Sequence, residues 1–166
     1  MQLPDAETLL DALVAQMRPH VRPDTALVGI RTGGVWMAER IHAALALSGP
    51  VGAIDVSFYR DDFGARGLPA KPQRTDIAFD VEGSHVIIVD DVLYTGRTVR
   101  AALNELFDFG RPGCVELAVL VDRGGRELPI AARYCAHTLA EPLPASQILE
   151  LGRDEAGVLS LRLIDA

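Results

Sequence analysis

Two adjacent carboxylates, Asp90 and Asp91, end an apolar run in the middle of the chain and could bind a phosphorylated sugar. The residues that follow, 94–98, supply two threonine hydroxyls, an arginine and Gly96, and they open a helical pattern. Carboxylates accept hydrogen bonds from vicinal sugar hydroxyls or hold hydrated Mg²⁺, while a helix start that contains glycine lets backbone N–H groups approach a phosphate. This combination predicts a sugar-phosphate site at the end of a strand.

The same residues could instead serve the fold alone, with both aspartates capping the next helix and TGRT forming a plain turn. Either feature by itself would favour that interpretation, whereas the two together favour a ligand site. The sequence has no G-x-x-x-x-G-K-[ST] motif, which disfavours a P-loop nucleoside triphosphatase. The segment GIRTGG at 29–34 does not satisfy the dinucleotide-binding fingerprint either.

The elements that must position this segment alternate between short apolar runs and helical patterns. Helices are expected over 5–18, from 35 to about 47, and from 99 to about 110. Strands are expected over 26–30, 51–59, 85–90 and 115–121, with further short strands in 132–137, 147–151 and 158–164. Repeated strand–loop–helix order predicts an α/β protein with a mainly parallel sheet, whose ligands bind beyond the carboxyl ends of the strands. We expect one domain over 1–166.

Residues 60–73 interrupt this order with charges, two glycines and two prolines but no usable periodicity. Loops of this length in a compact domain are commonly lids or binding elements, so we predict a long mobile loop or a hairpin. A plain solvent-exposed connection is the alternative.

The composition limits the partners and the compartment. With 16 basic and 23 acidic residues the net charge is −7, which disfavours binding to polyanions unless the basic residues cluster. No apolar stretch is long enough to cross a bilayer, and Cys114 and Cys135 are expected to be reduced core residues, so we predict a cytoplasmic protein without membrane contact. The four histidines are scattered, and we assign no intrinsic metal site.

The segment VIIVDDVLYTGRT at 86–98 resembles the 13-residue phosphoribosyl-diphosphate motif of type I phosphoribosyltransferases. The blocks at 27–34, 55–62 and 109–130 resemble, more closely, the branch of that family whose members attenuate pyrimidine operons and act as uracil phosphoribosyltransferases. The resemblance covers about residues 26–136. It implies the type I phosphoribosyltransferase fold, a central mainly parallel sheet flanked by helices, with a small C-terminal hood and a flexible loop.

The resemblance also implies a role for each matched residue. Asp90 and Asp91 would face the ribose hydroxyls of 5-phosphoribosyl-1-diphosphate (PRPP) and hold its Mg²⁺, directly or through water. Arg60, with Asp61, would begin the flexible loop that closes over the reacting centre. The other implied substrate-binding residues form a diphosphate loop, a 5-phosphate loop and a pair that contacts the base and product: Arg31, Thr32, Gly33 and Gly34; Val92, Leu93, Tyr94, Thr95, Gly96, Arg97 and Thr98; and Asp122 and Arg123.

The implied reaction transfers the phosphoribosyl group from PRPP to N1 of uracil, which yields UMP and diphosphate. Such a reaction needs no nucleophilic side chain, because catalysis depends mainly on positioning and electrostatics. Purine-salvage members commonly carry an aspartate at the position of Tyr94, so the tyrosine favours a pyrimidine acceptor.

Two positions depart from the family pattern: Gly33, where an arginine is frequent, and Ala131, where a basic residue is frequent. The alternative function is a nucleotide-sensing regulator that binds pyrimidine-operon messenger RNA and has weak or no turnover. That alternative predicts a basic surface formed by His20, Arg22, Arg126 and Arg133. The resemblance further implies a homo-oligomer, a dimer or a tetramer.

Overall fold

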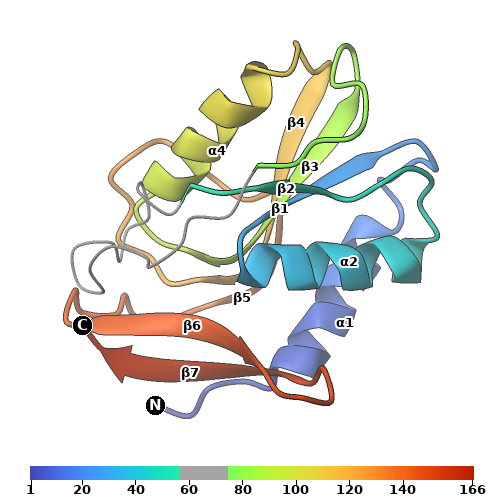
Figure 1. Ribbon diagram of the computed structural model, residues 1–166. Helices are drawn as coiled ribbons and strands as arrows, with labels where there is room; N and C mark the ends of the chain where they lie inside the picture. The colour runs from blue at the N-terminus through green and yellow to red at the C-terminus, as the bar shows by residue number, and fades with distance from the viewer. Residues whose placement is uncertain (57–74) are drawn as a thin grey trace.

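The computed structural model describes residues 1–56 and 75–166, and its centre is a five-stranded parallel sheet (Figure 1). The sheet order is β2-β1-β3-β4-β5, and every neighbouring pair is parallel. A separate antiparallel hairpin pairs β6 with β7. In chain order the described elements are α1 (Ala6–Met17), β1 (Ala26–Ile30), α2 (Gly33–Leu45), β2 (Gly52–Ile54), β3 (His85–Leu93), α4 (Arg97–Phe107), β4 (Cys114–Asp122), β5 (Tyr134–Thr138), β6 (Gln147–Arg153) and β7 (Leu159–Asp165).

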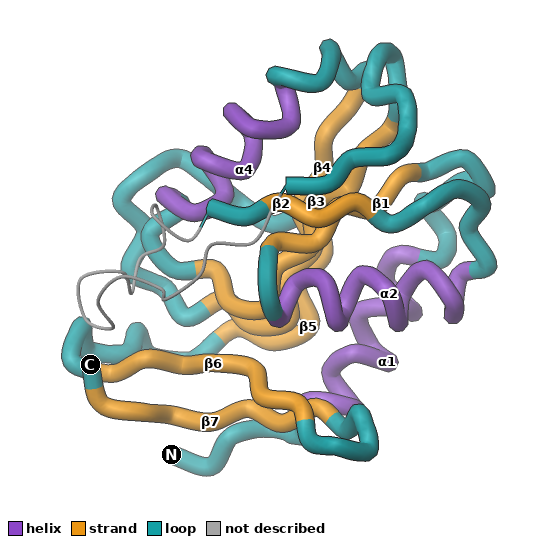
Figure 2. The backbone as a smooth tube through the Cα atoms, in the orientation of Figure 1, coloured by secondary structure: helices purple, strands orange, loops and turns teal. Residues whose placement is uncertain are grey.

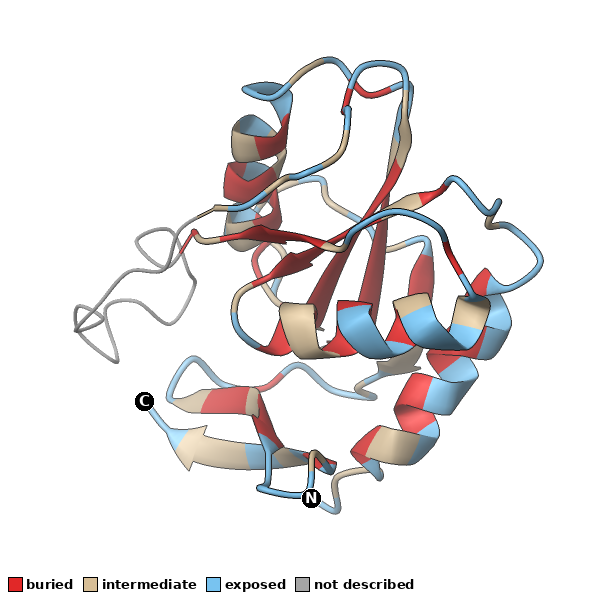
Figure 3. Ribbon diagram, turned by 45° about the vertical axis from the view of Figure 1, so that its right-hand side comes forward, coloured by how far each residue is buried: buried red, intermediate tan, exposed pale blue. Residues whose placement is uncertain are grey.

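Helices cover both faces of the sheet, as the predicted α/β order requires (Figure 2). The central strand β3 shows why, because its side chains alternate between two cores. Ile87 and Val89 pack in the core that contains α1 and α2, whereas Val86 and Ile88 pack in the core that contains α4. The strands of the sheet are accordingly the most deeply buried part of the fold (Figure 3).

The hairpin of β6 and β7 forms a small hood at the bottom of Figure 1, beside α1 and both chain termini. Its residues Leu149, Leu151 and Leu159 join the core that contains α1 and α2. Leu151 also donates its backbone N–H to the carboxylate of Asp91 in β3, at 3.3 Å. The hood is therefore fixed to the sheet at the strand that carries the candidate site.

Several predicted boundaries differ from the structure, and three of them bear on the site or on the extent of the sheet. Strand β3 continues to Leu93 instead of ending at Asp90, because its pairing with β4 runs on through Leu93 and Asp122. Helix α2 begins at Gly33, two residues earlier than predicted. Strand β2 ends at Ile54, although the predicted strand ran to residue 59; residues 57–59 lie outside the described part of the chain.

The prediction that both cysteines are core residues is wrong. Cys114 is exposed because it opens β4 at the rim of the sheet, and Cys135 is partly exposed because β5 is an edge strand; both thiols are free. Within the described ranges, no helix is long and apolar enough to span a bilayer, and no three His, Cys, Asp or Glu side chains gather as metal ligands would.

Candidate functional site

The paired carboxylates lie inside β3, and both are buried: Asp90 is 5% exposed and Asp91 is 7% exposed. An Asp90 oxygen accepts from the N–H of Asp91 at 2.9 Å. One Asp91 oxygen accepts from the N–H of Val92 at 2.9 Å, and the other accepts from Leu151 of the hood. A buried carboxylate is costly unless it is hydrogen-bonded, and these backbone donors satisfy part of that need. Since a carboxylate accepts about four hydrogen bonds, Asp91 keeps acceptor capacity for a ligand.

The predicted strand ends at Asp90, but the observed strand continues for two residues beyond Asp91, so Asp91 lies within β3. The loop proper consists of 94–96 and leads into α4. Gly96 precedes the helix with φ +95°, a conformation that favours glycine. The Thr95 hydroxyl accepts from the N–H of Arg97 at 3.1 Å and thereby holds the first helical residue.

The segment 31–34 brings a second helix start to the same place. Arg31 and Thr32, joined by a cis peptide bond, connect β1 to Gly33 and Gly34, which are the first two residues of α2. A Cβ atom at Gly33 would lie 2.8 Å from Asp91 Oδ2, and one at Gly34 would lie 2.3 Å from the carbonyl oxygen of Val89. The absence of both side chains lets α2 begin directly against the carboxylates of β3.

The starts of α2 and α4 differ electrostatically from the start of α1. Helix α1 is capped by the carboxylate of Asp5, which accepts from the N–H of Thr8 at 2.9 Å, and it has Glu7 in its first turn. Helices α2 and α4 have no side-chain cap of this kind at Thr32 and Gly96 and no acidic residue in their first turns. Their N-terminal N–H groups and dipoles therefore favour anions, as the diphosphate and 5-phosphate groups of PRPP would require.

The structure thus brings most of the predicted residues to one edge of the sheet, although not all in the predicted way. Leu93 has its side chain in the core at 1% exposure, so only its backbone could serve a ligand. Val92 is also a strand residue, packed partly against the core that contains α1 and α2. Thr98 lies in the first turn of α4. Arg60 and Asp61 lie outside the described residues.

A brace formed by residues 122–128, which begin at the last residue of β4, holds the loop 94–96. Glu127 and Leu128 donate their N–H groups to the carbonyl oxygen of Thr95 at 2.9 and 3.0 Å. Arg126 donates to the carbonyl oxygen of Tyr94 and to the carboxylate of Asp122, both at 2.5 Å. The loop is therefore positioned by the end of β4 as well as by β3.

Arg123 and Arg97 also have partners within the protein. Arg123 is 4% exposed, and its guanidinium lies 3.8 Å from the centre of the Tyr94 ring. It donates to the carbonyl oxygen of Gln147, the first residue of the hood, and to those of Leu143 and Pro144 in the segment that leads into it. Arg97 pairs with exposed Glu127 at 2.8 Å. The predicted contacts of Asp122 and Arg123 with the base stay predictions, since in this structure both side chains bind protein groups.

Sequence reasoning did not place two contributors to this edge, Arg126 and the N–H of Leu151. A signal for Arg126 existed, because it follows Asp122 by four residues in a glycine-containing turn. No side-chain pattern could reveal Leu151, since its contribution is a backbone group.

A second polar cluster lies toward the opposite, amino edge of the sheet, around buried Glu116. Its carboxylate contacts His85, Arg133 and Tyr134. Burial by itself raises the pKa of Glu116, but hydrogen bonds from His85 and Arg133 outweigh this effect and lower that pKa below its usual value. Burial and the nearby Glu116 charge raise the pKa of Tyr134. The cluster shares no residue with the candidate site.

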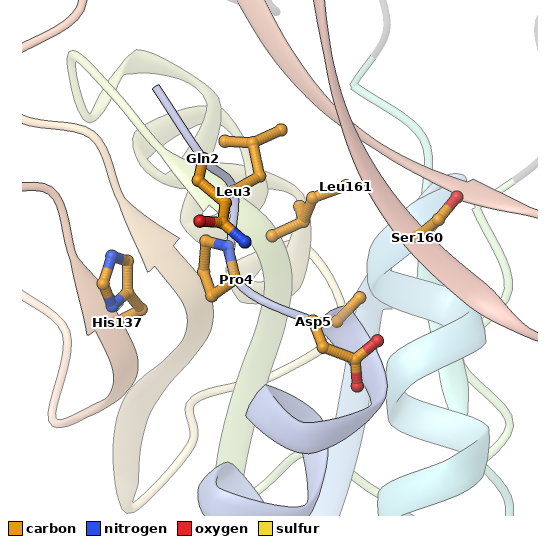
Figure 4. Close-up of a pocket in the computed structure, with 8 residues that line it drawn as sticks. Gln2, Leu3, Pro4, Asp5, His137, Ser160 and Leu161 are labelled. Atoms are coloured by element: carbon orange, nitrogen blue, oxygen red, sulfur yellow. The ribbon is translucent and has the colours of Figure 1, made fainter.

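A cavity of about 590 Å³ near the N-terminus also lies apart from the candidate site (Figure 4). It is lined by residues 2–6, by His137 of β5, and by Ser160 and Leu161 of β7. Because none of the predicted site residues within 1–56 and 75–166 lines this cavity, it does not alter the assignment of the site to the carboxyl edge of β3.

Known proteins are similar to this chain in sequence and in fold. The phosphoribosyl transferase domain family matches residues 2–138. A protein named bifunctional protein PyrR from Pseudomonas savastanoi pv. phaseolicola is 43% identical over 166 residues, which cover 98% of this chain and 96% of that protein. A protein of the same name from Ralstonia nicotianae is 47% identical over 157 residues, which cover 92% and 88%.

Solved structures confirm the predicted type I phosphoribosyltransferase fold. A purine phosphoribosyltransferase from Pyrococcus horikoshii aligns with a TM-score of 0.62 at 27% identity over 82% of this chain and 84% of that chain. A hypoxanthine-guanine phosphoribosyltransferase from Bacillus anthracis aligns with a TM-score of 0.66 at 19% identity over 84% of each chain. The chain belongs to the phosphoribosyltransferase family, in the group of relatives that carry the name bifunctional protein PyrR.

Proposed function

We propose that the protein is a uracil phosphoribosyltransferase that uses PRPP as donor and releases UMP and diphosphate. The observation that carries this proposal is that two helix starts flank the end of the strand that holds the buried carboxylates Asp90 and Asp91. Gly33 lies directly against Asp91, and Gly96 follows the end of β3 by three residues. PRPP needs sites for two anionic groups, separated by a ribose with two free hydroxyls. The helix starts suit the anions and the carboxylates suit the hydroxyls.

Mg²⁺ fits this donor set as a partner of PRPP. It prefers oxygen ligands, and it is usually held by one or two carboxylates together with substrate phosphates and water. Asp90 and Asp91 supply the carboxylates, and the described residues contain no larger cluster that would form a cage made of protein ligands alone. Bound with PRPP, the ion would neutralise charge on the departing diphosphate.

The chain's own residues would promote the reaction by positioning. The bond between C1 of the ribose and the diphosphate breaks while the bond to N1 of uracil forms, so positive charge develops on the ribose. In this proposal Asp90 and Asp91 hold the ribose hydroxyls and stabilise that charge. The first turn of α2 would receive the diphosphate, and 95–98 would fix the 5-phosphate. Because helix dipoles and buried carboxylates are already in place, little reorganisation is needed.

Uracil is preferred over purines in this proposal because of Tyr94. Its ring is packed beneath the guanidinium of Arg123 and beside Gly125, where an added Cβ would lie 2.5 Å from the ring. A tyrosine held in this way offers no carboxylate to assist deprotonation of a purine. The names of the relatives, which mark them as bifunctional, are compatible with an enzyme that also has a regulatory role.

An acceptor panel tests the proposal. The protein is incubated with PRPP, Mg²⁺ and one of uracil, orotate, hypoxanthine or guanine, and nucleotide and diphosphate are quantified. We expect UMP and diphosphate in equal amounts from uracil, with at least about a hundredfold lower turnover for the purines, since a mismatched polar edge leaves buried groups unpaired. Turnover of a purine above that of uracil would refute the proposed preference for uracil. No turnover with any of the bases would refute the proposed phosphoribosyltransferase activity.

As a second function we propose regulation through pyrimidine-operon messenger RNA, which the bifunctional name of the relatives supports. Arg133 contacts His20 at 3.3 Å, and the chain of contacts continues through Glu116 and His85 to Thr25, which accepts from the N–H of Arg22 at 2.9 Å. Of the four basic residues predicted for an RNA surface, His20 and Arg133 are thus in side-chain contact. Arg22 is connected to them only through its backbone N–H, and its side chain pairs with Asp24.

Arg126 does not belong to this surface. It binds Asp122 at the other end of β4, about 20 Å from Glu116 at the usual rise of a strand. An RNA surface would then lie toward the amino edge of the sheet, away from the donor site.

Binding of a transcript of the protein's own pyrimidine leader, with and without UMP, tests the regulatory proposal. We expect the RNA affinity to depend on UMP, to fall with salt, and to fall further in Arg133→Gln, with Arg162→Gln, at an exposed arginine of β7, as the control. RNA affinity that UMP does not change would refute nucleotide sensing. Sedimentation tests the accompanying proposal of a dimer or tetramer.

A further inference from the structure

Arg123 connects two parts of the protein that are far apart in sequence. Its side chain donates to the carbonyl oxygen of Gln147 at 2.8 Å, and to those of Leu143 and Pro144 at 3.2 and 3.1 Å. The same guanidinium lies over the ring of Tyr94. Tyr94 belongs to the loop that the proposed function assigns to the donor, and 143–147 is the segment that enters the hood.

The position of Arg123 allows it to couple the Tyr94 loop to segment 143–147, beyond satisfying the carbonyl oxygens of that segment. Arg123 is 4% exposed, and its planar guanidinium presents edges to the hood carbonyls and a face to the Tyr94 ring. Its backbone N–H donates to the carbonyl oxygen of Leu93 at 3.0 Å, so its main chain is fixed to the residue that precedes Tyr94. A movement of the Tyr94 loop therefore displaces the ring that contacts the guanidinium. Because the same guanidinium donates to the carbonyl oxygens of 143–147, such a movement also acts on that segment.

The hood has a second, independent connection to the donor motif. The N–H of Leu151 donates to Asp91 Oδ2, and this bond does not involve Arg123. Gln147 and Leu151 thus report on two different connections between the hood and β3. This difference allows the contribution of Arg123 to be measured separately.

We propose that Arg123 is a positioning residue that couples the donor-binding loop at Tyr94 to the hood segment 143–147, so that donor binding orders this side of the hood. The proposal rests on the proposed function, because it requires PRPP to occupy the loop. Arg123 acts through Tyr94 and the hood carbonyls, and it need not touch the donor. Its energetic contribution comes from several charge-assisted hydrogen bonds and a buried cation–π contact, each significant on its own.

Amide hydrogen exchange, measured residue by residue with and without PRPP and Mg²⁺, tests this coupling. In the native protein we expect the donor to slow exchange at 95–98, at Gln147 and at Leu151. In Tyr94→Leu, which removes the ring but leaves the hood partners of Arg123, we expect the effect at Gln147 to fall by about tenfold while Leu151 still responds. Tyr94→Phe is the matched control, since it keeps the ring, and it should retain the response at Gln147.

Arg123→Lys is the complementary variant, because it keeps the charge but lacks the fork that reaches several carbonyls at once. Any destabilisation from burying the ammonium is monitored by thermal unfolding, and Tyr94→Leu keeps the test decisive if the lysine variant does not fold. The same donor response at Gln147 in Tyr94→Leu as in Tyr94→Phe would overturn the coupling. So would an unresponsive Gln147 in the native protein when 95–98 respond. If 95–98 do not respond to PRPP at all, the proposed function fails and the coupling falls with it.

Discussion

Replacing Asp91 with asparagine separates the two tasks that the structure gives this carboxylate. Its oxygens accept from the N–H groups of Val92 and Leu151, and the proposed function adds a ribose hydroxyl or hydrated Mg²⁺. Asparagine has one acceptor oxygen, so one of the two backbone N–H groups would face an amide NH₂. Leaving a buried donor unsatisfied costs about 1–3 kcal/mol. We therefore expect Asp91→Asn to fold with a melting temperature lowered by roughly 2–12 °C.

The effect on donor binding should exceed this effect on stability. A hydrogen bond to a charged group contributes about 1.5–3 kcal/mol, so the affinity for PRPP with Mg²⁺ should fall by about ten- to a hundredfold. Isothermal titration calorimetry on the folded variant measures the affinity, and differential scanning calorimetry measures the stability. Glu155→Gln is the matched control, since it removes one negative charge from an exposed site in the turn between β6 and β7.

The reasoning fails if folded Asp91→Asn binds PRPP within twofold of the native protein. It also fails if Glu155→Gln weakens binding as much as Asp91→Asn does, because the effect would then arise from overall charge instead of from this contact.

Three further predictions follow from the packing, the charges and the metal. Gly34→Ala places a Cβ 2.3 Å from a backbone oxygen of β3 and should lower the free energy of unfolding by about 1–3 kcal/mol or more in urea denaturation, whereas Gly152→Ala, whose nearest neighbour is a side-chain atom at 3.5 Å, should change it little. Equal effects of the two substitutions would contradict the close approach of α2. Hydrogen bonds from His85 and Arg133 hold the pKa of Glu116 low despite its burial, so its stabilisation should be present above its unfolded pKa near 4.5 and be lost as the pH falls through the lower folded value. Plots of unfolding free energy against pH for the native protein and Glu116→Gln should therefore converge at acid pH. Plots that stay parallel would show that ionised Glu116 is not the source of this stabilisation. Chelation of Mg²⁺ with EDTA should weaken PRPP binding by at least about tenfold, and unchanged calorimetric affinity would argue against a metal-assisted site.

The fold was largely predictable because hydrophobic periodicity and chain order carry most of its information. Alternating apolar runs and helical stripes predicted a mainly parallel sheet, and the pairing of β1, β3 and β4 follows that pattern. The family resemblance added the helices that flank it. The end of β3 was not predictable in this way. Asp90 and Asp91 interrupt the apolar run, so the pattern ends the strand there, while pairing with β4 continues it to Leu93. Tertiary pairing overrides a local polar signal at a site that needs buried charge.

The site was predictable as a set of residues but not as a set of contacts. Residue types and spacing indicated the carboxylates, Gly96 and the loop before α4, and the family resemblance added Gly33 and Gly34 as candidates. The contacts of the Arg123 side chain could not be predicted, because its partners are backbone carbonyls of a segment distant in sequence. The role of Leu151 was hidden for the same reason. Contacts between a side chain and remote backbone leave little trace in sequence patterns.

The central claim is that PRPP binds at the carboxyl edge of β3, and a crystal structure with PRPP and Mg²⁺ tests it most directly. The account predicts ribose hydroxyls within hydrogen-bonding distance of Asp90 and Asp91, the 5-phosphate at 95–98, and the diphosphate at the start of α2. Density for PRPP at any other place, such as the cavity between the N-terminal segment and β7, would contradict the account.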